Sequence, residues 1–332
     1  MVMIVWQYHF KIWRDSMQAG IYYFSCQFTS IAVLPVFKGS TLRGGLGHAL
    51  RRIACALRRQ DCMGCLLRDS CAYAFLFEVA QSPKHDVATD NRPIVQRPHP
   101  YVLIPPDNET RTYQAGDSFS FRLILLGSAI QYLPHLVFAV QEMGKTGLGK
   151  GNKNGDGCFQ LGTVHQADTL IFDGLTLNSS LPPRELALAP TPAAKITKII
   201  LTCQTPLRLK RDSQLQNGLP FHILIRAALR RISSLESTYG GNGEPVIDYK
   251  GLVARAAAVA TTSSSCRWTE IERYSNRQHT AMLMGGITGT VTYQAEDLSE
   301  FVPLLRYCEI VHLGKQTSFG LGRIRIETED AL

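Results

Sequence analysis

In the first half of the chain, segments with the apolar pattern of a strand alternate with segments that have the apolar period of a helix. Tyr, Phe, Ile and Val dominate Ile21–Val33, a pattern typical of a strand. Thr41–Arg59 repeats leucine and isoleucine at three- and four-residue steps, which predicts a helix with Ser40 as its N-cap. The same patterns predict, in order, strands Tyr101–Ile104 and Phe119–Leu126, helix Ile130–Met143 and strand Cys158–Val164.

The second half of the chain repeats this order of elements. Its predicted elements are strand Ile196–Leu209, helix Phe221–Leu235, strands Arg267–Arg273 and Met282–Tyr293, helix Leu298–Tyr307 and strand Arg323–Glu327. Strand, helix, two strands, helix and strand form the βαββαβ order of a ferredoxin-like unit. The sequence therefore predicts an α+β fold of two tandem ferredoxin-like, RRM-like domains.

Length and composition place the boundaries of these domains. A chain of 332 residues suits two domains of ~150 residues each. Residues 1–19 show no clear period and are assigned to an N-terminal extension, and the proline-rich stretch 181–193 predicts a linker. The N-terminal domain then covers residues 20–180, and the C-terminal domain covers residues 194–332.

Charge and hydropathy indicate which classes of partner the chain can bind. Thirty-five Lys and Arg against 27 Asp and Glu give a net charge of +8, which suits a polyanionic partner such as nucleic acid. No stretch approaches the ~20 apolar residues that span a bilayer, so no membrane partner is expected. The N-terminus lacks the order of a signal peptide, which favours a cytoplasmic location.

Two glycine-rich segments lie between a predicted helix and a predicted strand, at Gly144–Gly157 and Gly314–Gly322. Glycine lets backbone N–H groups approach a phosphate closely, so the second segment is predicted to grip RNA. Its candidate RNA contacts are Gly314, Lys315, Thr317, Ser318, Gly320, Gly322 and Arg323. The structural alternative is a tight connection whose glycines need positive φ angles.

Four cysteines fall within a short segment after the first helix, Cys55, Cys62, Cys65 and Cys71. Four thiolates at this density can close a tetrahedral site, and a reducing cytoplasm disfavours disulfides. We therefore predict a structural zinc site in segment 55–71, with an iron–sulfur cluster as the alternative. Idle thiols or a disulfide would explain the segment without a metal.

A set of ordered fragments resembles one known family. Residues 37–52, FKGSTLRGGLGHALRR, resemble the first-helix signature of the CRISPR precursor-RNA processing endoribonucleases of the RAMP superfamily, in the cysteine-bearing branch. The resemblance continues through Met143–Lys150, Thr205–Leu209, Arg273–Gln278 and Val311–Arg323, and covers about Ile21 to Glu327. It implies tandem ferredoxin-like domains, cleavage within CRISPR repeat RNA without a catalytic metal, and continued binding of the mature guide RNA (crRNA).

Metal-free RNA cleavage needs a base for the attacking 2′-hydroxyl, an acid for the leaving oxygen and a cation for the phosphorane. His48 lies where the resembling family commonly places its catalytic histidine. His312 is the second choice, Lys315 is the candidate cation and Tyr22 could assist. The sequence alone does not decide between His48 and His312. Candidate RNA contacts outside the glycine-rich segment are Arg43, Arg51, Arg52, Arg273 and Arg277.

Two other functions fit the same features. A non-catalytic RAMP-type scaffold that binds crRNA within a CRISPR effector complex, alongside other effector subunits, would also need basic faces and a glycine-rich loop. A metal-stabilised interaction subunit would use its basic surface for assembly alone.

Overall fold

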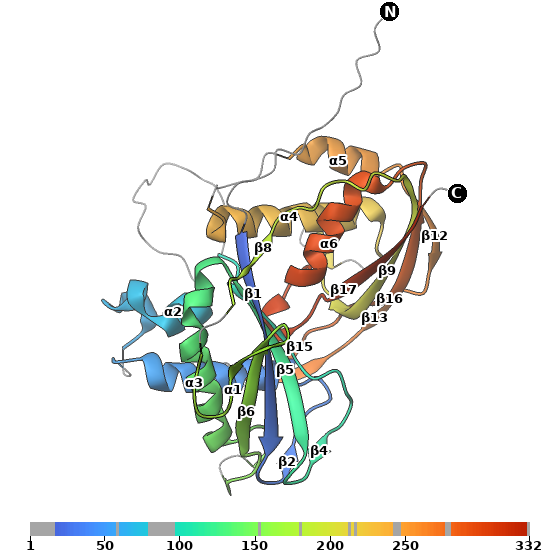
Figure 1. The fold of residues 1–332 in the computed structure, drawn as a ribbon. Coiled ribbons are helices and arrows are strands. Elements are labelled where there is room, and N and C mark those ends of the chain that lie inside the picture. The colour runs from blue at the N-terminus through green and yellow to red at the C-terminus, as the bar shows by residue number, and fades with distance from the viewer. Residues whose placement is uncertain are drawn as a thin grey trace, which may run out of the picture.

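The computed structural model describes residues 17–57, 60–78, 97–151, 154–178, 181–211, 214–215, 218–241, 247–275 and 280–330. The described residues form two large antiparallel sheets with helices packed against them, and three two-stranded sheets (Figure 1). No helix in these ranges is long and apolar enough to cross a membrane.

The first unit follows the predicted order. Its elements are β1 (Met17–Phe28), α1 (Gly39–Ala54), β3 (Tyr101–Ile104), β5 (Ser118–Leu126), α3 (Leu133–Thr146) and β6 (Phe159–Gln166). Its sheet has the order β3-β5-β1-β6, extended by β7 (Thr169–Phe172). With β1 between β5 and β6 and all pairs antiparallel, this is the sheet of a ferredoxin-like unit.

The second unit repeats that arrangement. Its elements are β9 (Ile196–Leu207), α4 (Phe221–Tyr239), β12 (Ala260–Ser264), β16 (Gly286–Gln294), α6 (Val302–Val311) and β17 (Ile324–Asp330). The sheet order β12-β16-β9-β17 again places the first strand between the third and the fourth. The predicted tandem ferredoxin-like fold is confirmed.

Several elements differ from the predicted bounds. Helix α1 begins at Gly39 with Lys38 as its N-cap, so Ser40 is a helical residue and caps nothing. The helix ends at Ala54, where the backbone of Cys55 turns to an extended conformation. The predicted linker contains β8 (Arg184–Leu186), which pairs with the start of β1. Most of the predicted extension lies outside the described residues, and its last three residues already belong to β1.

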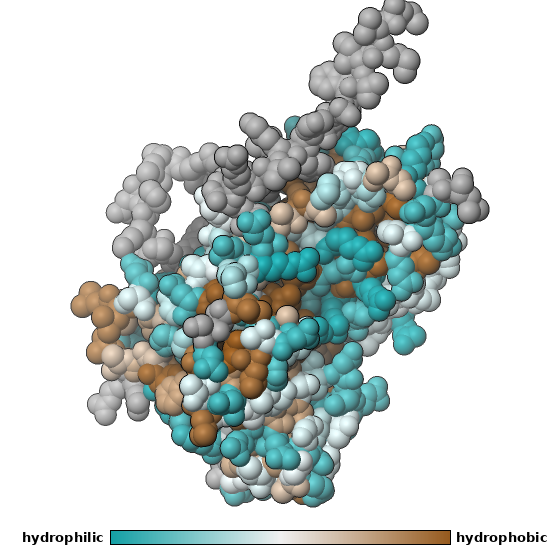
Figure 2. Space-filling view, in the orientation of Figure 1, coloured by the Kyte–Doolittle hydropathy of each residue, from teal (hydrophilic) through white to brown (hydrophobic). Residues whose placement is uncertain are grey.

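Short helices and strands are added to the two units. They are β2 (Ala32–Val33), β4 (Thr112–Tyr113), α2 (Ala72–Phe77), β10 (Lys210–Arg211), β11 (Gln214–Leu215), α5 (Tyr249–Ala256), β13 (Arg267–Thr269), β14 (Glu272–Ser275) and β15 (Thr280–Leu283). The cysteine segment precedes α2 and exposes the apolar side chains of Met63, Leu66 and Leu67. Figure 2 shows this apolar surface at its left edge.

Strand β1 connects the two hydrophobic cores. Tyr22, Phe24 and Phe28 point to the face of the sheet that α1 and α3 cover. Met17 and Ala19 lie on the opposite face, in the core that contains α4 and α6. Because side chains alternate across a strand, one strand serves both cores and fixes the units against each other.

Candidate functional site

The glycine-rich loop Gly314–Gly322 packs against neighbouring backbone, and this packing explains its glycines. Gly314, Gly320 and Gly322 all have positive φ. A Cβ on Gly320 would lie 2.7 Å from the carbonyl oxygen of Leu103 in β3, and one on Gly314 would lie 2.6 Å from that of Arg208. Gly320 therefore lets the loop pack against the first unit, and Gly314 lets it pack within the second unit, whether or not RNA binds.

The hydroxyls of this loop face the protein. Thr317 is buried, and its Oγ1 accepts a hydrogen bond from Nη2 of the partly buried Arg231 at 3.2 Å. Ser318 is buried beside the Tyr101 hydroxyl. Lys315 is exposed, and Arg323 is half-buried, 3.8 Å from Asp107. In this arrangement Lys315 is the side chain of the loop that solvent reaches most freely, and the expected RNA contacts of Thr317 and Ser318 stay predictions.

Two arginines from different units meet on one aromatic ring of the loop. The guanidinium carbon of Arg43, from α1, lies 4.4 Å from the ring centroid of Phe319, and that of Arg273, from β14, lies 4.8 Å away. The Nε atoms of both arginines are buried without a hydrogen-bond partner, and neither side chain forms an ion pair with a described residue. We call Arg43, Phe319 and Arg273 the arginine cluster.

The arginine cluster suits an anion. The ring face stabilises each cation, but the two like charges repel each other, and burial together with Arg43 lowers the pKa of Arg273. A phosphate bound by both guanidinium groups would relieve this repulsion and accept hydrogen bonds from their N–H groups, since guanidinium pairs strongly with phosphate. The arrangement therefore favours a polyanion at the junction of the two units.

His99 fixes the position of Arg43. Its Nδ1 lies 3.1 Å from the Leu76 carbonyl oxygen, and its Nε2 lies 3.1 Å from Nη2 of Arg43. Nδ1 must donate to the carbonyl, so Nε2 is the acceptor for Arg43 and the ring is neutral. Burial and the charge of Arg43 lower the pKa of His99 to about 4, which keeps it neutral at ordinary pH.

Helix α1 exposes His48 on the side opposite its buried leucines. Gly44, one turn earlier, has open space where a side chain would lie, so that face is accessible. His48 forms no hydrogen bond or ion pair with any residue in the described ranges. Its proton-accepting nitrogens are thus available to a ligand, although its catalytic role stays a prediction.

The other basic residues of α1 contact protein groups. The guanidinium carbon of Arg51 lies 5.7 Å from the ring centroid of Tyr73. Arg52 forms an ion pair of 3.2 Å with Glu142 of α3, and Lys145 binds the same carboxylate. These contacts join α1 to its neighbours, and RNA would have to compete with them.

Tyr22 and His312 lie in the core, which corrects the expectation that they could reach RNA. Tyr22 is fully buried among the residues beneath α1, and burial raises its pKa to about 12. His312 is also fully buried, its Nδ1 is 3.2 Å from the Leu321 carbonyl oxygen, and burial lowers its pKa to about 3. Between the two candidate histidines, His48 is therefore the accessible one.

Three of the four clustered cysteines lie near one another. The pKa of the Cys62 thiol is raised by burial and by the neighbouring Glu78, with Cys55 and Cys71 also in electrostatic range. Within the described ranges, no three His, Cys, Asp or Glu side chains are arranged as metal ligands. This geometry does not fit a preformed metal site, and the zinc site stays a prediction.

Sequence reasoning missed the residues that organise the site. Phe319 carried no signal beyond its place in the glycine-rich loop, and His99 lies in a polar segment without a pairing pattern. The predicted RNA contact Arg277 lies outside the described residues. Two arginines contact the same ring only when distant segments fold together, so spacing along the chain could not reveal this cluster.

Comparisons with known proteins agree with the fold. A family model described as CRISPR-associated endoribonuclease Cas6 matches residues 201–324, and a model described as an N-terminal domain matches residues 17–181. An uncharacterized protein of Archaeoglobus fulgidus is 26% identical over 300 residues, covering 89% of this chain and 93% of that protein.

Solved structures share the whole two-unit arrangement. Thermus thermophilus Cas6 is similar with a TM-score of 0.54 at 11% identity, covering 94% of this chain and 99% of its own. A Cas6 solved as a product complex is similar with a TM-score of 0.55 at 13% identity, and the match covers 93% of this chain and 99% of that one. A chain of a partial Cas6-RT-Cas1–Cas2 complex is similar with a TM-score of 0.57 at 14% identity. That match covers 96% of this chain but only 48% of the other.

Proposed function

We propose that the chain is a RAMP-type protein of the Cas6 family, an endoribonuclease that cuts CRISPR repeat RNA into mature crRNA. The match of residues 201–324 to the Cas6 endoribonuclease model supports an RNA-cleaving enzyme. The observation that carries the proposal is the arginine cluster, because it gathers cations of both units with free N–H groups beside the helix that exposes His48.

The proposed reaction needs only groups of the RNA and the protein. The 2′-oxygen attacks the adjacent phosphorus, and the bond from phosphorus to the 5′-oxygen breaks. This gives a 2′,3′-cyclic phosphate and a 5′-hydroxyl. One proton leaves the 2′-hydroxyl and one reaches the 5′-oxygen, so no water or redox partner is consumed and no metal is required.

His48 is proposed to move a proton in this step. An imidazole titrates near working pH, and a positioned histidine contributes on the order of 10²–10⁴ to the rate. Lys315 and the arginine cluster are proposed to hold the phosphate and stabilise the charge of the phosphorane, with His99 aiming Arg43. Repeat RNA and mature crRNA are the proposed partners, with other CRISPR effector subunits as further ones.

Product analysis tests the proposed reaction. Purified protein is incubated with the repeat RNA of its own CRISPR locus in EDTA, and the ends of the fragments are analysed. We expect cleavage at one position with a 2′,3′-cyclic phosphate and a 5′-hydroxyl. Tight binding without cleavage would contradict the proposed enzyme and favour a non-catalytic scaffold. Cleavage that stops in EDTA would contradict the metal-free reaction.

A further inference from the structure

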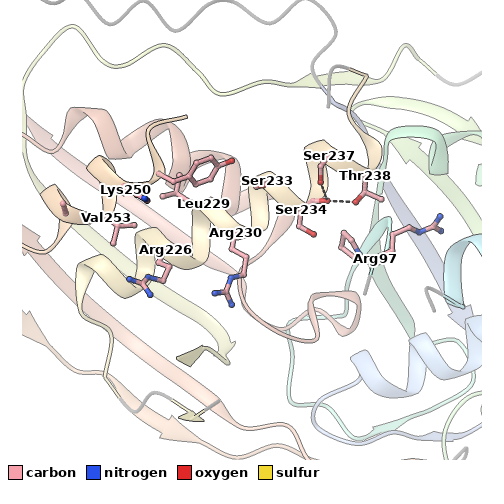
Figure 3. Close-up of a pocket in the computed structure, with 13 residues that line it drawn as sticks. Arg97, Arg226, Leu229, Arg230, Ser233, Ser234, Ser237, Thr238, Lys250 and Val253 are labelled. Atoms are coloured by element: carbon pink, nitrogen blue, oxygen red, sulfur yellow. Dashed lines mark hydrogen bonds between the residues drawn. The ribbon is translucent and has the colours of Figure 1, made fainter. Parts of the chain in front are cut away.

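A large basic cavity lies outside the candidate site. Helices α4 and α5, together with Arg97 and Pro98 before β3, enclose about 930 Å³, which we call the α4 cavity (Figure 3). Among the described residues, four cations line it and no carboxylate does; the cations are Arg97, Arg226, Arg230 and Lys250. The hydroxyl residues Ser234, Ser237 and Thr238 and the aliphatic Leu229 and Val253 complete its lining.

The exposed arginines of α4 have no anionic partner among the described residues. Arg226 and Arg230 are one helical turn apart, ~6 Å along the axis, and project from the same side of α4 (Figure 3). Neither forms an ion pair with a residue in the described ranges. Arg255 on the neighbouring α5 differs, because Glu300 holds it at 2.7 Å and Asp248 at 3.4 Å. Like charges at this spacing destabilise a helix, so the pair is costly unless an anion compensates it.

Arg97 is held in place at one end of the cavity. Its Nη2 donates to the Phe75 carbonyl oxygen at 2.8 Å, and its guanidinium stacks on the rings of Phe75 and Tyr239. Its Nε is buried without a hydrogen-bond partner. A cation fixed in this way loses little entropy on binding an anion.

Segment 97–99 contributes to both the α4 cavity and the arginine cluster. Arg97 lines the cavity, and it precedes by two residues the His99 that bonds Arg43. Because one short segment contributes to both basic sites, one extended polyanion can serve as the ligand of both.

We propose that the α4 cavity binds a second, single-stranded stretch of the RNA held at the arginine cluster; this rests on the proposed function. The cations would hold phosphates, and the partly buried Val253 would contact unpaired bases or riboses. Single-stranded RNA fits better than a duplex because a duplex buries its base faces.

Charge reversal on α4 tests the proposal. Arg230→Glu and Arg226→Glu are made singly, with Arg111→Glu as the matched control. Arg111 is exposed and precedes β4, at the opposite end of the molecule from α4 (Figure 1). Dissociation constants are measured for two RNAs, the repeat alone and the repeat with single-stranded flanks, over a range of salt concentrations.

We expect each α4 variant to bind the flanked RNA about tenfold more weakly, with a salt dependence reduced by about one phosphate contact. The same variants should lose much less affinity for the repeat alone, and Arg111→Glu should bind both RNAs like the wild type. Equal binding of flanked RNA by wild type and α4 variants would overturn the proposal, and would turn attention to an acidic protein partner. A wild type that binds neither RNA would instead overturn the proposed function itself.

Discussion

Replacing Gly320 by alanine should separate the packing role of the glycine-rich loop from a role in RNA binding. Gly320 has φ +92, and a Cβ there would lie 2.5 Å from Pro105 Cδ and 2.7 Å from the Leu103 carbonyl oxygen. The left-handed backbone alone costs an L-residue about 1–2 kcal/mol. Overpacking against β3 adds about 1–3 kcal/mol, because the carbonyl belongs to a paired strand and cannot move freely.

Gly116 provides the matched control, since its φ is +97 and nothing lies within 4 Å of its Cβ position. Gly116→Ala should therefore cost about 1–2 kcal/mol of unfolding free energy, and Gly320→Ala about 2–5 kcal/mol. Urea denaturation of both variants, followed by circular dichroism, measures the difference. Equal losses in the two variants would refute the packing explanation and return the glycines to a role in RNA binding alone.

Three further predictions follow from buried and clustered groups. Tyr22→Phe removes a buried hydroxyl without a partner, so RNA cleavage and stability should stay at wild-type values; a large loss of cleavage would restore Tyr22 as a catalytic residue. Because the pKa of His99 is lower in the folded protein, the unfolded chain binds more protons below pH 6.5. The free energy of unfolding should therefore fall by about 3 kcal/mol between pH 6.5 and 4, and should fall less in His99→Gln. An equal dependence on pH in wild type and His99→Gln would contradict this. The predicted structural zinc requires about one zinc per chain in the wild type and its loss in Cys62→Ser, whereas a metal-free, folded wild type would contradict it.

The sheet order could be derived from the sequence because strands and helices differ in apolar period. Ile196–Leu209 and Phe221–Leu235 carry those periods over many residues, and the structure places β9 and α4 almost on them. The short α2 and α5 were missed because fewer than three turns give little periodicity. The pairing of β8 with β1 depends on tertiary contact, and the proline-rich sequence of this stretch gave no pattern that would predict a strand.

The candidate site was predicted less completely than the fold. Residue type pointed to histidines and arginines, but only tertiary packing decides that His312 is buried and His48 exposed. Apolar neighbours on both sides of His312 were a usable sign of burial. Nothing comparable marked His99, whose function depends on a carbonyl of Leu76 and a guanidinium of α1.

The central claim is that α1 presents His48 as a proton-transfer group to RNA held by the arginine cluster. His135 on α3 is also an exposed helical histidine, so His135→Ala is the matched control. Single-turnover cleavage of repeat RNA in EDTA should slow by on the order of 10²-fold or more in His48→Ala, with RNA affinity near that of the wild type. His135→Ala should cleave like the wild type. Wild-type cleavage by His48→Ala would contradict the account.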